Sequence, residues 1–390
     1  MHLMCNKEHE HARRRSISRH SLTPGGTMHI PDGYLSPQTC AVGYAVSVPV
    51  LAVAAVRVKR VVRNRHVPTL AVFSAVSFLA MMFNVPIPDG TTAHAVGAAV
   101  IAIVLGPWAA VLAVSVALAF QALLFGDGGV LSYGANVFNM AIVLPFSALA
   151  VYRLIAGRTE LTSGRRVVAA AISGYVGINL AALAAAIEFG IQPSLFHDAS
   201  GTPLYAPYHL SQTIPAMALA HLTVAGAAEA ILTGGVVAYL QRANLPLLRL
   251  NHPGIPVTAD ETAAGGRRLR PVTIAAAAVG LMVVLTPLGL LAPGGAFGED
   301  APEDLDLSKV HLSAVPDGLN KYAGWWHHAI FDGYDFSNDA HPWVGYIISA
   351  VVGIAAIGVA IFLLGLVVQR LSRREADERT ETGSSAVSAP

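Results

Sequence analysis

Two adjacent residues near the beginning of the chain, Met28 and His29, form a pattern that can chelate a transition metal ion. If translation starts at Met28, its free amine, the backbone nitrogen of His29 and the His29 imidazole are all donors. Together they close a five-membered and then a six-membered ring around one ion. Such a planar set of nitrogens suits Ni(II) and Cu(II), fits Co(II) less well and is poor for Zn(II). A fourth donor must come from elsewhere.

The best candidate for the fourth nitrogen is His94. It follows a turn at 84–92 whose prolines and glycine stop one apolar run before the next begins. A lone histidine near a helix end is more often a capping or interfacial residue than a ligand. The charge distribution described below, however, places His94 on the same outer side as Met28 and His29, and this coincidence favours a ligand role.

Three further polar residues, Asp32, Thr92 and Asn136, are expected near the same outer face, where they could orient His29 or His94 by hydrogen bonds. Each also has a plain structural interpretation: Asp32 as a turn residue, Thr92 as a helix N-cap and Asn136 as a loop or helix-start residue. The Gly-Asp-Gly-Gly sequence at 126–129 lacks the Lys-Ser/Thr pair of a phosphate-binding loop, so it predicts a turn.

The composition is that of an integral membrane protein. The chain has 390 residues, of which 54% are hydrophobic and 13% charged, and its mean hydropathy is +0.55. Its two cysteines, Cys5 and Cys40, are too few for a disulfide framework or a cysteine-based zinc site. The formal net charge of +1 conceals a strong segregation of charge along the chain, and no nucleic-acid-binding surface is indicated.

Long apolar runs recur along the chain, and a helix of about 20 apolar residues crosses a bilayer. The runs lie at 39–58, 67–84, 93–105, 108–125, 135–152, 167–188, 212–240, 272–292 and 343–369. The third run is short, and Gly106-Pro107 separates it from the fourth. Sequence alone therefore allows either two crossings or one long broken helix over 93–125.

The distribution of Lys and Arg favours two crossings. Eighteen of these residues then fall on one side of the membrane, after the first, fifth, seventh and ninth runs, against Lys309 and Lys321 on the other. The positive-inside rule makes the first side cytoplasmic. We therefore expect an all-α, polytopic membrane helical bundle with about nine transmembrane helices, its N-terminus outside and its C-terminus cytoplasmic.

Residues 1–27 do not fit this topology, because their five Lys and Arg residues would lie outside. They contain no apolar core for a signal peptide. The expectation is that 1–27 is an extension absent from the mature protein, whose true start is Met28. Alternatively, the histidines of this segment could form a tail that gathers metal ions.

Four segments resemble the CbiM/NikM family, the metal-binding membrane component of energy-coupling-factor cobalt and nickel uptake transporters. They are MHIPDGYLSP, GTTAHAVG, FQALLFGDGGVLSYGANVFNMAIVLPF and AGAAEAILTGGVVAYL, in the family's order over residues 28–242. The resemblance implies that the amine of Met28, the backbone nitrogen and side chain of His29, and His94 hold the metal. It also implies two partners, a transmembrane coupling protein (CbiQ/NikQ-like) and a P-loop ATPase (CbiO/NikO-like).

The second half of the chain divides into a cytoplasmic linker at 243–271, two helices within 272–370 and a polar cytoplasmic tail at 371–390. The two-helix part resembles the small NikN-like accessory component, which carries the motif Pro316-Asp317-Gly318-Leu319. Its external loop at 293–342 is acidic and contains His327 and His328. These histidines could relay cations that the acidic residues attract, although a merely solvated loop is the plainer interpretation.

The sequence thus favours capture of Ni(II) or Co(II) at the outer face of a prokaryotic plasma membrane, with ATP hydrolysis on separate subunits. No organic cofactor is expected, and no G-x-x-x-x-G-K-[ST] or H-E-x-x-H motif occurs. A metal-sensing membrane receptor and an intramembrane metalloenzyme are the alternatives. Planar nitrogen coordination favours nickel over cobalt. Glu229, deep within an apolar run, is a candidate for a pairing or gating role.

Overall fold

The computed structural model describes residues 29–61, 67–87, 90–255, 271–291, 298, 301–335 and 341–387. Met28, the extension 1–27 and most of the predicted linker lie outside the described residues. The amine and the translation start that the chelate hypothesis needs therefore stay predictions. His29 is the first residue that the structure describes.

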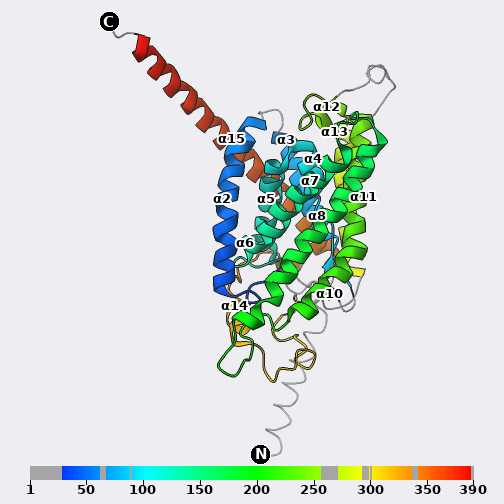
Figure 1. The fold of residues 1–390 in the computed structure, drawn as a ribbon, viewed down its shortest axis with the longest axis vertical. Helices are drawn as coiled ribbons and strands as arrows, with labels where there is room; N and C mark the ends of the chain where they lie inside the picture. Colours follow the sequence, from blue (N-terminus) through cyan, green and yellow to red (C-terminus); the bar gives the residue numbers. More distant parts are fainter. Residues whose placement is uncertain are drawn as a thin grey trace, which may run out of the picture.

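Long helices run side by side and form the body of the molecule (Figure 1). Apolar surroundings explain this, because a helix satisfies its own backbone hydrogen bonds where no water is available. Every predicted apolar run overlaps at least one of these helices. They are α2 (Pro37–Val61), α3 (Val67–Met82), α4 (Ala98–Leu105), α5 (Pro107–Phe125), α7 (Leu144–Ala156), α8 (Gly164–Gly190), α10 (Leu210–Ala220), α11 (Gly226–Ala243), α13 (Pro271–Leu285) and α15 (Pro342–Val387).

Among the described residues, six helical segments are long and apolar enough to cross a membrane. They are Pro37–Val58, Pro107–Phe125, Tyr133–Ala156, Gly164–Leu195, Leu210–Ala243 and Pro342–Val367. The apolar helices Val67–Met82 and Ala276–Leu288 are shorter. The helical membrane class is thus confirmed, whereas the count of nine crossings and the orientation of the termini stay predictions.

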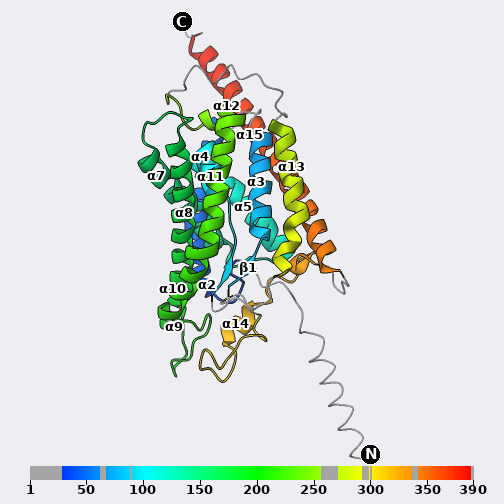
Figure 2. The same cartoon turned by 90° about the vertical axis from the view of Figure 1, so that its right-hand side faces the viewer.

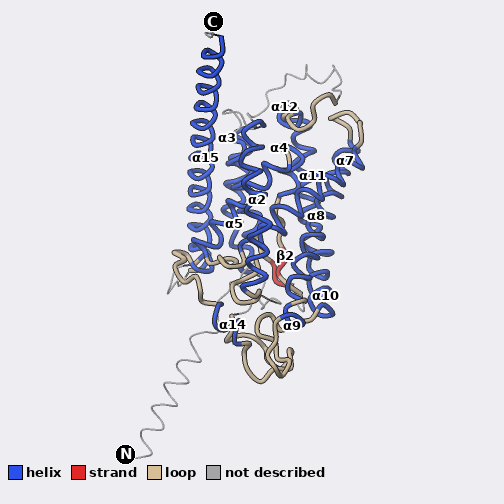
Figure 3. The backbone as a smooth tube through the Cα atoms, turned by 60° about the vertical axis from the view of Figure 1, so that its left-hand side comes forward, coloured by secondary structure: helices blue, strands red, loops and turns tan. Residues whose placement is uncertain are grey.

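The third apolar run forms a helix of only eight residues, α4, whose side chains are all buried. It is preceded by strand β2 (Thr92–Ala93), which pairs antiparallel with β1 (Val85–Pro86), and by four residues without regular structure. β2 lies toward one end of the bundle and α4 toward the other (Figure 3). After Gly106, which has a φ of 94°, α5 runs back along the bundle. Residues 92–125 therefore pass along the bundle twice.

Two of the long runs contain a π-helical segment. Val137–Val143 (η2) separates α6 (Tyr133–Asn136) from α7, and His221–Ala225 (η3) separates α10 from α11. Short π-helical turns within α-helices are frequently found at functional sites. Nothing in the apolar periodicity predicts them.

Close approach of helices α7 and α8 depends on small residues. A Cβ atom added to Gly177 of α8 would lie 2.9 Å from the Ala148 Cβ of α7 and 3.0 Å from the Leu144 carbonyl oxygen. Small side chains at such crossings allow tight packing where lipid provides no hydrophobic drive between helices. This packing explains why position 177 is a glycine and position 148 an alanine.

The accessory helices pack against the first half of the chain, with α13 and α15 beside α3 (Figure 2). The loop between them contains α14 (Asp317–Tyr322) and the short helix η6 (Asp332–Tyr334). At α14, the Leu319 backbone N–H donates to the Leu204 carbonyl at 3.1 Å. α14 lies at the same end of the bundle as β1 (Figure 2).

The short connecting elements position α4 as well. The beginning of the predicted linker forms α12 (Leu245–Arg249), and the Asn251 side chain donates to the Ala102 and Ile103 carbonyls at 3.0 and 3.2 Å. The remaining short helices are α9 (Gln192–Leu195) and η5 (Thr286–Leu291).

The prediction that Thr92 caps a helix is wrong. Thr92 lies in β2, and α4 begins after Gly97, whose φ is 73°.

Candidate metal centre

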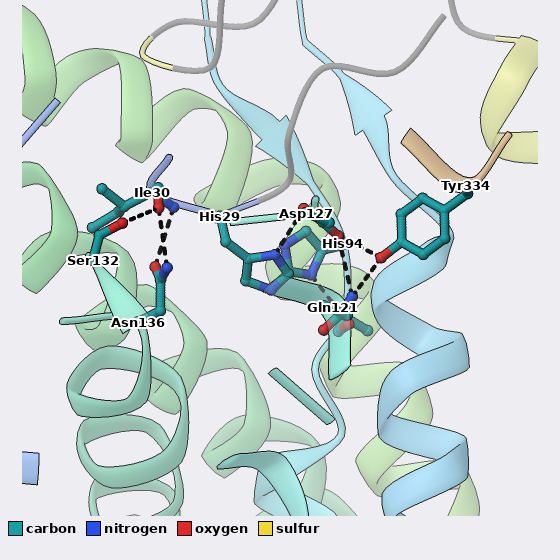
Figure 4. Close-up of polar contacts among 9 residues, drawn as sticks. His29, Ile30, His94, Gln121, Asp127, Ser132, Asn136 and Tyr334 are labelled. Carbon is teal, nitrogen blue, oxygen red and sulfur yellow. Dashed lines mark hydrogen bonds and ion pairs between the residues drawn. The ribbon is translucent and has the colours of Figure 1, made fainter. Parts of the chain in front are cut away.

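The structure brings the imidazoles of His29 and His94 together (Figure 4). Their ring centroids are 5.3 Å apart and their planes are inclined by 42°. His29 is 4% exposed and His94 7% exposed, so both rings are removed from bulk solvent. Two of the three residues predicted to bind metal are therefore neighbours. The third, Met28, precedes His29 directly in the sequence but lies outside the described residues.

Asn136 holds the backbone next to His29. Its side-chain amide accepts from the Ile30 N–H and donates to the Ile30 carbonyl, both at 3.1 Å. The same carbonyl also accepts from the Ser132 hydroxyl at 2.7 Å (Figure 4) and from the Gly129 N–H at 2.9 Å. Asn136 thus acts on the backbone of the N-terminal segment in the structure, and its bonds fix where His29 can lie.

Asp32 anchors the same segment from its other side. Its carboxylate accepts from the backbone N–H groups of Val130, Leu131 and Ser132 at 3.1, 2.8 and 3.2 Å. Burial raises the pKa of the Asp32 carboxyl, and these hydrogen bonds oppose the shift. Asp32 therefore joins the N-terminal segment to the loop that follows α5.

Asp127, predicted only as part of a turn, contacts His29 directly. Its Oδ1 lies 3.2 Å from His29 Nδ1, and both side chains are buried. There is no room for a side chain at Gly128, where an added Cβ would lie 2.8 Å from the His29 Cβ. The sequence contained one indication of this contact. Metal-binding histidines commonly pair with a carboxylate, and Asp127 is a carboxylate in a glycine-rich turn on the predicted outer side.

Two more buried groups surround Asp127. The Tyr334 hydroxyl donates to Asp127 Oδ2 at 2.5 Å, and Gln121 Nε2 donates to the same oxygen at 3.2 Å and to the Tyr334 hydroxyl at 2.9 Å (Figure 4). Gln121 belongs to α5, whereas Tyr334 belongs to the accessory segment. Nothing local in the sequence indicates this contact, since Tyr334 and Asp127 are 207 residues apart.

The segment that follows His94 is held by Glu229 of α11. The buried Glu229 carboxylate accepts from the backbone N–H groups of Val96 and Gly97 at 2.8 Å and of Ala99 at 3.4 Å. These groups lie at the beginning of α4, where helical N–H groups have no partner within the helix. Glu229 therefore has a pairing role, with the backbone that follows His94.

A cavity of about 70 Å³ adjoins the two imidazoles. Two polar atoms of residues in its wall, His29 Nε2 and Asn139 Oδ1, are buried without a hydrogen-bond partner. Buried polar atoms are normally satisfied, so a cavity with two unsatisfied acceptor positions suits a bound ion or water. Other residues that line it include Thr92, His94, Asn136, Met140, Met217 and His221.

His327 and His328 lie apart from this buried environment. Their rings are adjacent, with centroids 4.2 Å apart, and both residues are exposed on the loop before η6. Their suggested part in a metal relay stays a prediction.

Few side chains within the described part of the chain are placed to bind a metal ion together. No group of three or more His, Cys, Asp or Glu side chains there is arranged to hold a metal ion. Two imidazoles completed by main-chain nitrogens would fit this arrangement, because such a site needs no further side-chain donor. A six-membered chelate ring through the backbone nitrogen of His29 must use His29 Nδ1, the atom that here contacts Asp127.

Comparisons with known proteins agree with a metal transport protein. A family model described as "CbiM: Cobalt uptake substrate-specific transmembrane region" matches residues 29–247. The fused nickel transport protein NikMN of Rhodobacter capsulatus is 47% identical over 348 residues, which cover 86% of this chain and 96% of that protein. The probable fused nickel transport protein LarMN of Lactiplantibacillus plantarum is 44% identical, with the same coverage of both chains.

A solved structure described as a transition metal transporter is similar to part of the chain. It is 58% identical, with a TM-score of 0.53, and the match covers 56% of this chain and 96% of that one. The match to the fused relatives is longer and extends into the accessory segment.

Proposed function

Because the chain belongs to the CbiM family and has the fused NikMN arrangement of its relatives, we propose that it captures Ni(II) or Co(II) at the outer face of a prokaryotic plasma membrane. It is a multi-pass membrane protein of the metal uptake class. The ion is its substrate. Relatives named as transport proteins favour this function over a metal sensor or a metalloenzyme.

The observation that carries the proposal is the contact between the His29 and His94 rings in a buried site. The Met28 amine, the His29 backbone nitrogen, His29 Nδ1 and one nitrogen of His94 would supply four donors. Four nitrogens in a plane suit Ni(II) better than Co(II). The proposal therefore includes a mature chain that begins at Met28 and a preference for nickel, as in the names of the fused relatives.

His29 Nδ1 must leave Asp127 before it can bind the ion. Rotation of the imidazole about its Cβ–Cγ bond exchanges the positions of its ring nitrogens and carbons. Nε2 would then lie where Cε1 lies now, and a shift of the Asp127 side chain toward it would allow Nε2–H to donate while Nδ1 faces the metal. A carboxylate on the second nitrogen of a metal-bound histidine fixes the tautomer and orientation of the ring. Asp127 thus has a role in both the empty and the loaded site.

The orientation rests on charge. The end of the bundle where α12 lies and to which α15 extends (Figure 1) is rich in Lys and Arg, and the positive-inside rule favours a cytoplasmic location for it. The His29 site, at the other end near α14, would then face outward. We further assign 28–242 as the metal-binding domain, 243–271 as a linker, 272–370 as the accessory domain and 371–390 as the cytoplasmic tail.

Release requires separation of the two imidazoles. His29 is held by contacts with residues 129–136, whereas His94 precedes a segment held by Glu229 of α11. Movement of α11 relative to the loop at 129–132 and α6 would pull His94 from the ion and open the site toward the cavity. Energy for this movement would come from a P-loop ATPase, transmitted through a transmembrane coupling protein docked on the bundle.

The test is uptake of radioactive nickel or cobalt into vesicles that contain this chain, its coupling protein and its ATPase. We expect accumulation against a gradient that depends on ATP. Vesicles with a His94→Ala chain should not accumulate the ion, and an exposed-site control, His327→Ala, should. Metal binding without ATP-dependent accumulation in the complete complex would contradict the transport proposal.

A further inference from the structure

One side chain of the accessory segment, Tyr334, reaches the metal centre directly. We propose that Tyr334 is a positioning residue whose hydroxyl fixes Asp127 and, through it, the His29 imidazole. The accessory segment would then be part of the metal site rather than a separate attachment. This inference rests on the proposed role of His29 as a ligand.

The first support is the hydrogen-bond geometry. Tyr334 is 3% exposed, and its hydroxyl donates to Asp127 Oδ2 at 2.5 Å while accepting from Gln121 Nε2 at 2.9 Å. The other carboxylate oxygen lies 3.2 Å from His29 Nδ1. One planar carboxylate thus joins the accessory segment to the ring (Figure 4). Hydrogen bonds to one of its oxygens restrict rotation of the carboxylate and so direct the other oxygen at His29.

The second support is that the loop before Tyr334 is docked on the end of α5, immediately before Asp127. The Phe331 N–H donates to the Leu124 carbonyl at 2.9 Å, and the Trp326 indole N–H donates to the Leu123 carbonyl at 3.1 Å. Phe125 stacks on Tyr334, with ring centroids 5.0 Å apart. These contacts use carbonyls that have no partner within the last turn of the helix.

The third support is the backbone of Tyr334 itself. Its φ is 65°, in the left-handed region that residues other than glycine rarely adopt, and Gly333 before it has a φ of 63°. The Tyr334 carbonyl accepts from the Ser349 hydroxyl of α15 at 3.0 Å. A disfavoured conformation persists where the surrounding structure enforces it, and such residues cluster at functional sites. The accessory segment thus holds Tyr334 at both its side chain and its backbone.

The test is a titration of the full chain with Ni(II) alone, with the affinity and the visible absorption spectrum of the bound ion as readouts. Tyr334→Phe keeps the aromatic ring and its stacking but removes the hydroxyl. We expect it to weaken nickel affinity by about 10-fold, the lower end of the loss found when a group behind a metal ligand is removed. The spectrum should shift, because His29 is no longer held in one orientation.

The matched control is Tyr346→Phe. Tyr346 belongs to the same accessory segment, is buried, and packs on Tyr334 with ring centroids 5.5 Å apart. The inference expects this variant to keep the affinity and the spectrum of the parent chain. An equal loss in both variants would indicate packing and would overturn the inference.

A double-mutant cycle separates positioning from general structure. If Tyr334 acts through Asp127, Tyr334→Phe should have no further effect in an Asp127→Asn chain. Full additivity of the two losses, or unchanged affinity and spectrum in Tyr334→Phe while the parent binds nickel, would overturn the inference. Failure of the parent chain itself to bind nickel would instead contradict the proposed function.

Discussion

His29 and His94 come from two segments that the rest of the structure holds independently, and their rings meet at a centroid distance of 5.3 Å. The N-terminal segment is held by Asn136 and Asp32 through backbone contacts, and the segment after His94 by Glu229. Because the two histidines are anchored by different elements, each can keep its own position within its segment while the distance between the two rings increases. That property suits a protein that must bind an ion and later release it.

His94→Ala is the residue-level prediction. Removal of a group behind a metal ligand costs about 10- to 100-fold in affinity, so removal of a ligand should cost more than ~100-fold. The expected result is loss of measurable nickel binding at equilibrium in the purified chain. The double variant His327→Ala/His328→Ala, which alters exposed residues, should bind as the parent does. Equal binding by His94→Ala and the parent would remove His94 from the site.

Sequence could predict the pairing of His29 and His94, because chelate chemistry and charge placed both on one side. It could not predict Asp127 or Tyr334. Their contact joins residues 207 positions apart and leaves no local pattern. Asp32, Asn136 and Thr92 were predicted to orient the imidazoles, and in the structure Asp32 and Asn136 act through the backbone. Whether the predicted residues bind metal stays a prediction.

At the scale of helices and strands, α4 shows how a membrane segment can be shorter than its apolar run. The run at 93–105 contains the end of β2, an irregular stretch and the eight residues of α4. The side chains of α4 are all buried against other helices. Irregular backbone within a membrane is tolerated where protein buries it. The partners of its polar groups, Glu229 at one end and Asn251 at the other, come from distant segments, so hydropathy alone could not reveal this shape.

Glu229→Gln tests the link between α11 and the segment after His94. A Gln side chain offers one acceptor oxygen where the carboxylate has two, so at least one buried N–H loses its partner. We expect the free energy of unfolding to fall by about 1–3 kcal/mol and nickel affinity to fall as well. Thermal unfolding and metal titration measure these effects, with the exposed Glu160→Gln as control. Unchanged stability and affinity would show that Glu229 does not position the segment.

Gly177→Ala tests the close packing of α7 and α8. The added methyl group would meet Ala148 and the Leu144 carbonyl at 2.9 and 3.0 Å, so overpacking should destabilise the protein by about 1–3 kcal/mol. Gly235 of α11 is the matched control, because an added Cβ has no atom within 4 Å. Gly235→Ala should stabilise its helix by up to about 1 kcal/mol. A shift of the thermal unfolding temperature in the same direction for both variants would contradict the close packing of α7 on α8 at Gly177.

At the scale of the whole molecule, the fused arrangement has a physical explanation. The two accessory helices pack on α3, and their connecting loop covers the end of the bundle where the candidate metal site lies. The sequence correctly indicated the family and the fusion, because the motifs that carry them are local. How the halves fit together depends on long-range contacts, which no motif records.

The proposed site includes the amine of Met28, which can bind the ion if Met28 is the first residue of the mature chain. The most direct measurement is nickel titration of two chains, one beginning at Met28 and one with four alanines inserted before Met28, with intact mass confirming each start. We expect the first chain to bind one nickel ion and the second to lose more than ~100-fold in affinity, because the five-membered chelate ring can no longer start from a free amine. Equal affinity of the two chains would contradict chelation by the N-terminus.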